Sequence, residues 1–127
     1  MGYNYNINKD IGVIYIVADS NFLEEGIKEF FVEIPEIAHE SKIRKVLLDC
    51  RKVKSEITMT ERFEYASELA KHFSGIKVAA VLEPPLRDPD LFGELVATNR
   101  GAIFHVCADM EEACSYLGVE QEQISLS

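Results

Sequence analysis

Residues 45–82 read KVLLDCRKVKSEITMTERFEYASELAKHFSGIKVAAVL. This stretch begins and ends with short, almost wholly apolar runs, Lys45–Asp49 and Ile76–Leu82, which are typical of strands covered on both faces. Between the two runs lies an amphipathic helix whose expected buried stripe is Phe63, Ala66, Leu69, Ala70 and Phe73. A strand, a helix and a second strand in that order predict a parallel strand pair joined by a crossover helix.

The same alternation continues in both directions along the chain. Tyr3–Asn8 alternates apolar and polar residues, as an edge strand does, and a short turn joins it to the apolar run Ile11–Ala18. The short connection predicts an antiparallel hairpin, and an amphipathic helix follows it. A third helix is expected to have Asp88 as its N-cap and Pro89 as its first residue. It should precede the last strand, Ile103–Cys107.

The sequence therefore predicts a single α/β domain over residues 1–118. Its element order is β-β-α-β-α-β-α-β-α, with a mixed, mostly parallel five-stranded sheet and four helices. Residues 119–127 are expected to form a polar, frayed C-terminal tail after the helix stop at Gly118.

Composition excludes several classes of function. The 127 residues carry a formal net charge of -9, and an acidic surface repels nucleic acids, so we expect no nucleic-acid partner. The absence of a signal peptide and of any bilayer-spanning apolar run predicts no transmembrane segment and a cytoplasmic location. Three cysteines without a CxxC pair indicate free thiols in a reducing compartment, namely Cys50, Cys107 and Cys114.

Residues 46–53, VLLDCRKV, resemble the third-strand signature of the STAS domains, in which an apolar strand ends in Asp and a short loop carries a Val. STAS domains are named for sulfate transporters and anti-sigma-factor antagonists. Four later segments resemble the SpoIIAA-like branch of that group, which contains many uncharacterised bacterial proteins: Thr58–Phe63, Lys77–Val81, Asn99–Gly101 and Asp109–Ala113. The resemblance covers essentially the whole chain and implies a STAS-like fold, related in outline to lipid-carrying domains.

The chain departs from the family at its regulatory motif. Anti-sigma-factor antagonists carry an Asp-Ser-Ser-Gly type motif before the second helix, and a kinase phosphorylates a serine in it. Here the corresponding stretch is Glu56–Thr60, which contains neither serine nor glycine. Thr58 and Thr60 are the available substitutes, and the alternative is that one of them is the N-cap of the helix.

Two side chains at the end of a predicted strand could carry chemistry. Asp49 is either a ligand-binding carboxylate or general base, or an acceptor for N–H groups of the following loop, and we favour the acceptor. Cys50 is the best-placed thiol, but its carboxylate neighbour opposes activation, so we expect a buried residue. No two histidines have metal-ligand spacing, and we predict no metal, no cofactor and no catalytic residue.

Basic residues gather in the loops at the carboxyl side of the predicted sheet. They are either a binding site for an anion or solvated loop charges. The candidate partner or ligand surface therefore comprises Asp49, Cys50, Arg51, Lys52, Lys54, Thr58, Thr60, Arg62 and Arg87.

Our leading hypothesis is a non-enzymatic regulatory or protein-interaction module. The resemblance to anti-sigma-factor antagonists implies that it binds a protein partner through the loop Cys50–Thr60 and the start of the second helix. The alternative is a binder of a small anionic or lipid-like ligand, with Phe63, Phe92 and Leu86 lining its site. An enzyme that uses Asp49 or Cys50 is a third hypothesis. The sequence is also compatible with a homodimer, formed either through the edge strand Tyr3–Asn8 or through an exposed helix face.

Overall fold

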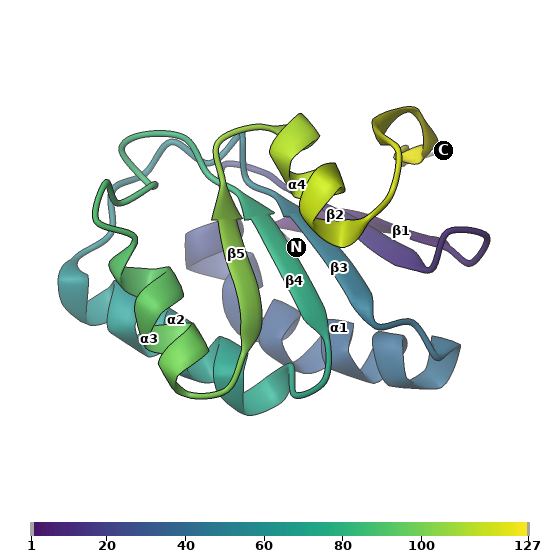
Figure 1. Ribbon diagram of the computed structural model, residues 1–127. Helices are drawn as coiled ribbons and strands as arrows, with labels where there is room; N and C mark the ends of the chain where they lie inside the picture. The colour runs from purple at the N-terminus through teal and green to yellow at the C-terminus, as the bar shows by residue number, and fades with distance from the viewer. Residues whose placement is uncertain (1, 127) are drawn as a thin grey trace.

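Five strands form one sheet in sequential order, β1-β2-β3-β4-β5 (Figure 1). The computed structural model describes residues 2–126. The first strand runs antiparallel to the second, and every later pair is parallel, which confirms the predicted mixed sheet. The strands are β1 (Tyr3–Asn8), β2 (Val13–Ala18), β3 (Lys45–Asp49), β4 (Lys77–Val81) and β5 (Ile103–Cys107).

Four α-helices alternate with the strands in the predicted order. They are α1 (Ile27–Ser41), α2 (Met59–His72), α3 (Phe92–Asn99) and α4 (Met110–Leu117), with a π-helical turn η1 (Phe22–Gly26) before α1 and a short 3-10 turn η2 (Gln121–Gln123) after α4. Helices α1, α2 and α3 cover one face of the sheet, and α4 covers the other (Figure 1). Right-handed crossovers between strands added in one direction place their helices on the same face, whereas α4 follows the last strand and has no crossover to make.

The sheet separates two apolar cores. The larger core lies under α1, α2 and α3, and its centre is a cluster of aromatic rings: Tyr3, Phe22, Phe30, Phe31 and Phe73. The smaller core lies under α4 and contains Leu47, Val81, Met110 and Leu117. Within residues 2–126, no helix has both the length and the apolarity needed to cross a bilayer.

The predicted start of the third helix is wrong. Helix α3 begins at Phe92, and Pro89 lies in the preceding loop. Asp88 still serves this helix, because its carboxylate accepts hydrogen bonds from the N–H groups of Asp90 and Phe92, both at 3.1 Å. Leu91 adopts a left-handed conformation with φ of 53°, which turns the chain into the helix.

The predicted buried stripe of the second helix is wrong at Phe63. This side chain is 40% exposed, and the guanidinium of Arg100 lies 5.0 Å from its ring centre. The inward face of α2 is centred on Ala66 and Leu69. Because each residue advances roughly 100° around a helix, Phe63 lies at the margin of that face rather than within it.

The tail after Gly118 is packed rather than frayed. Ile124 and Val119 lie against the smaller core. The side-chain amides of Asn6 and Asn8 on β1 donate hydrogen bonds to the carbonyl oxygens of Ser125 and Gln123, at 2.9 and 3.2 Å. The tail therefore covers the part of the sheet beside α4. Met1 and Ser127, the outer ends of the predicted domain and tail, lie outside the described residues.

Candidate functional site

Asp49 ends β3 as a buried carboxylate, only 3% exposed, that is held by its neighbours. It accepts hydrogen bonds from the backbone N–H of Arg51 at 3.1 Å, from Arg51 Nε and Nη2 at 2.9 and 2.8 Å, and from the Tyr15 hydroxyl at 2.8 Å. Burial by itself would raise the pKa of Asp49, but these hydrogen bonds and the charge of Arg51 hold it below its ordinary value. The prediction that Asp49 accepts hydrogen bonds from the following loop is confirmed.

Cys50 is buried, as predicted. It lies in the larger core, on the face of the sheet that α1, α2 and α3 cover. Burial raises the pKa of its thiol, and the charge of Asp49 raises it further. A thiol in this state is a poor nucleophile, because the thiolate is the reactive form.

Thr58 is the N-cap of α2. Its hydroxyl accepts from the N–H of Glu61 at 3.0 Å, and the Glu61 carboxylate accepts from the N–H of Thr58 at 2.8 Å. This reciprocal pair is a capping box, which satisfies two N–H groups that the helix start would otherwise leave free. Thr60 lies exposed in the first turn of the helix.

Three of the predicted basic residues bind partners within the protein. Arg51 pairs with Asp49, Lys54 Nζ lies 2.9 Å from Glu83 Oε1, and Arg62 Nη1 donates to the carbonyl oxygen of Leu86 at 2.7 Å. Lys52 is exposed and Arg87 is half-buried. The five basic side chains thus do not converge on one anion pocket.

An apolar cavity of about 110 Å³ lies between the sheet and the helices α1, α2 and α3. Its floor comes from β3, β4 and β5, and its roof from η1, α1, α2 and the loop over 82–91. Of the predicted site residues, Cys50 and Arg62 line it, as does Leu86. Phe63 and Phe92, which were also expected to line a ligand site, do not border this cavity; Phe63 borders a separate hollow with Lys71 and Arg100.

Small residues leave this space unfilled. Ala66 on α2, Ala80 on β4 and Gly93 on α3 all border the cavity. Gly93 also admits the stem of Arg62, since a Cβ there would lie 3.3 Å from Arg62 Cγ. Cavities lined by apolar side chains stay dry and accept apolar molecules; one of roughly 150 Å³ holds benzene.

Three charged side chains border the cavity, those of Arg62, Asp88 and Glu94. The two carboxylates already form hydrogen bonds with other groups of the protein. The Asp88 carboxylate accepts from backbone N–H groups of its own loop. The Glu94 carboxylate accepts from the N–H of Val106 at 2.6 Å and contacts His105. Arg62 differs, because its Nε is buried and has no hydrogen-bond partner among residues 2–126. Arg62 therefore keeps one donor available at the edge of the cavity.

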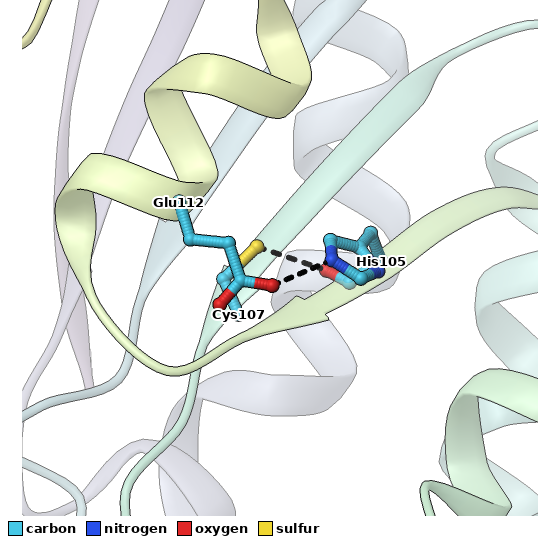
Figure 2. Close-up of side chains that lie close together, drawn as sticks. All are labelled: His105, Cys107 and Glu112. Carbon is cyan, nitrogen blue, oxygen red and sulfur yellow. Dashed lines mark hydrogen bonds and ion pairs between the residues drawn. The ribbon is translucent and has the colours of Figure 1, made fainter.

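A second polar cluster lies at the open edge of the sheet, on β5 (Figure 2). His105 places Nδ1 2.9 Å from Glu94 Oε1 and Nε2 2.8 Å from Glu112 Oε2. Hydrogen bonds from Ala108 and His105 lower the pKa of Glu112. Burial, followed by the charges of Glu112 and Glu94, raises the pKa of the Cys107 thiol to about 12.

The sequence prediction missed this cluster because it compared only the spacing of histidines. His105 and Cys107 stand two residues apart on a strand, so they project from the same face. Glu112 lies in the first turn of the helix that follows. A search for His-x-Cys on a strand followed by an acidic helix start would have found the group.

Comparisons of the chain with protein-family models, with curated proteins and with solved structures found no match. The resemblance to STAS domains stays a prediction.

Proposed function

We propose that this chain is a non-enzymatic, STAS-like domain that binds a small amphipathic anion, with the apolar part in the cavity and the charged group at Arg62. The observation that carries this proposal is an apolar cavity of about 110 Å³ bordered by a buried guanidinium nitrogen without a partner. The loop and hydrogen-bond contacts of Asp49 and the burial of Cys50 favour binding over catalysis by these two residues.

The chemistry of the lining defines the ligand class. Aliphatic and aromatic side chains surround the cavity, so they favour a short hydrocarbon chain or a ring. A buried donor without a partner costs free energy, and a carboxylate or phosphate oxygen placed against Arg62 Nε removes that cost. The cavity, at about 110 Å³, is smaller than one that holds benzene, so the expected ligand is a short carboxylic acid such as butanoate.

The first experiment is native mass spectrometry of the purified protein, followed by denaturing extraction. We expect a stoichiometric small molecule, or, for an empty protein, saturable binding of butanoate in a calorimetric titration. Butanol, which lacks the charge, should bind at least about tenfold more weakly, because hydrogen bonds to charged groups contribute about 1.5–3 kcal/mol. The same spectrum reports whether the chain is a monomer or a homodimer.

Variants connect this binding to the cavity. Arg62→Met keeps the apolar stem and should abolish the preference for butanoate over butanol. Lys71→Met, a matched loss of charge on an exposed position of the same helix, should leave that preference unchanged. Ala66→Leu fills the cavity and should prevent binding of both molecules. An empty protein that binds neither molecule would contradict the proposal.

A second candidate function is the binding of a protein partner at the start of α2. Two apolar side chains are presented to solvent there, Met59 at 56% and Phe63 at 40% exposure. Exposed apolar groups next to one another are common at interaction surfaces. Affinity capture should recover a partner with the wild type and lose it with the Met59→Ser/Phe63→Ser double variant, whereas Leu126→Ser, another exposed apolar position, should retain it. Equal recovery with the double variant would exclude this surface.

A further inference from the structure

We propose that His105, Cys107 and Glu112 form a binding site for one divalent metal ion of the zinc type at the open edge of the sheet (Figure 2). A ring nitrogen of His105, Sγ of Cys107 and a carboxylate oxygen of Glu112 all lie within 4.8 Å of one another, and Nε2 is the ring nitrogen next to Glu112. Two residues project from the same face of β5, and the first turn of α4 brings the third over them. This site is separate from the apolar cavity, whose lining includes none of the three residues.

The mixture of donors selects the kind of metal. Imidazole nitrogen, thiolate sulfur and carboxylate oxygen together suit Zn²⁺, whereas Mg²⁺ and Ca²⁺ prefer oxygen ligands throughout. Around a tetrahedral zinc with bonds of about 2.0–2.3 Å, neighbouring ligand atoms lie about 3.3–3.8 Å apart. In the structure His105 Nε2 lies 2.8 Å from Glu112 Oε2, and all three ligand atoms lie within 4.8 Å of one another, so metal binding requires side-chain adjustment of His105 as well as of the exposed Glu112.

The surroundings orient two of the three ligands. Glu94 Oε1 lies 2.9 Å from His105 Nδ1, the ring nitrogen that faces away from the proposed metal, and the N–H of Val106 fixes the same oxygen at 2.6 Å. A carboxylate on the second nitrogen of a ligating histidine fixes the ring and raises its basicity. The N–H of Ala108 holds Glu112 Oε1 at 2.9 Å, which leaves Oε2 directed toward His105. Glu94 is therefore a positioning residue.

The charges of the ligands also fit a cation, because a thiolate and a carboxylate balance the two positive charges of the ion. Cys107 itself is buried, but the other two ligands border a polar hollow that is lined by His105, Asp109, Glu111, Glu112, Ser115 and Tyr116. Water can therefore reach a fourth coordination position. Binding displaces the thiol proton of Cys107 and any proton on His105 Nε2, and both pass to the solvent. Affinity should therefore rise with pH.

The test is a titration of the full-length, metal-free protein with Co²⁺, followed by Zn²⁺. We expect one Co²⁺ per chain, a near-ultraviolet thiolate-to-cobalt band, and loss of that band when Zn²⁺ displaces Co²⁺. Cys107→Ala should abolish the band. Glu112→Gln should weaken binding by at least about tenfold, and Glu94→Gln by about 10- to 100-fold while the band is retained.

Matched variants separate this site from general effects of charge. Glu111→Gln removes an acidic group that lines the same hollow but is not one of the three ligands, so it should weaken binding much less than Glu112→Gln, and Cys50→Ala on the opposite face should leave the affinity unchanged. If Cys107→Ala does not fold, Glu112→Gln, at an exposed position, still tests the site. Failure of Co²⁺ to bind, binding without a thiolate band, or equal weakening by Glu111→Gln and Glu112→Gln would overturn the proposal.

Discussion

Replacing Phe30 by alanine is expected to lower the free energy of unfolding by about 4 kcal/mol, within the usual range for a fully buried phenylalanine. Phe30 is 1% exposed, and its ring contacts those of Tyr3, Phe22, Phe31 and Phe73, with centroid distances of 5.3 to 6.2 Å. The truncation removes these contacts. It also enlarges the cavity that Phe30 already borders, and such a cavity adds its own cost.

Urea unfolding followed by circular dichroism measures this loss. A domain of ordinary stability, about 5–15 kcal/mol, stays folded or becomes marginal after it. Phe63→Ala is the matched control, because the same atoms leave a side chain that is 40% exposed, and we expect a loss of less than about 1 kcal/mol. Equal losses from the two substitutions would show that Phe30 is not at the centre of the core.

Replacing Asp49 by asparagine is expected to destabilise the fold by about 2–3 kcal/mol at neutral pH, because a buried carboxylate loses charge-assisted hydrogen bonds to Tyr15 and to the half-exposed Arg51. The amide cannot accept all the hydrogen bonds that the carboxylate takes from Arg51 and Tyr15. It also leaves the guanidinium of Arg51 without its counter-charge. Thermal or urea unfolding of both proteins gives the difference directly.

The difference in stability between the wild type and Asp49→Asn should depend on pH. Because the folded pKa of Asp49 lies below its ordinary value, its contribution is complete above about pH 4 and disappears as the pH falls through the folded value. The stability of the wild type should therefore approach that of Asp49→Asn in acid. A difference that stays constant down to strongly acidic pH would show that the charge of Asp49 is not the cause.

Tyr15→Phe provides the control for this site, since it removes one hydrogen bond and leaves the pair of Asp49 with Arg51. We expect a loss of about 1 kcal/mol. Burial, followed by the hydrogen bond to Asp49, raises the pKa of Tyr15 to about 12. The contribution of the Tyr15 hydroxyl to the free energy of unfolding is therefore complete below its ordinary pKa, near 10, and disappears as the pH rises through about 12.

Local patterns in the sequence were enough to predict the arrangement of strands and helices. The apolar runs at Lys45–Asp49 and Ile76–Leu82, with a helix between them, require a parallel pair, because a crossover of that length returns the chain in the same direction. The sequence also predicted that Thr58 or Thr60 caps the second helix, which the structure resolves as Thr58, and that Asp49 is an acceptor. Both depend on N–H groups only two or three residues away in the chain.

Only the tertiary structure decided where the cavity lies and which polar groups from distant parts of the chain come together. The cavity exists because Ala66, Ala80 and Gly93, from three different elements, face the same volume. The exposure of Phe63 depends on how α2 is rotated against its neighbours, and apolar spacing along a helix does not determine this rotation to within one residue.

The same limit applies to the edge of the sheet and to the tail. His105 contacts Glu94 and Glu112 because α3 and α4, which lie on opposite faces of the sheet, both pack beside the edge strand β5. Residues 119–126 are polar in sequence, yet Ile124 packs on the smaller core and two asparagines of β1 hold the backbone. Contacts between residues far apart in the chain decide both features, whereas apolar periodicity and helix capping depend only on residues that are neighbours in sequence. The sequence by itself therefore determined the elements and their order. It did not determine these sites.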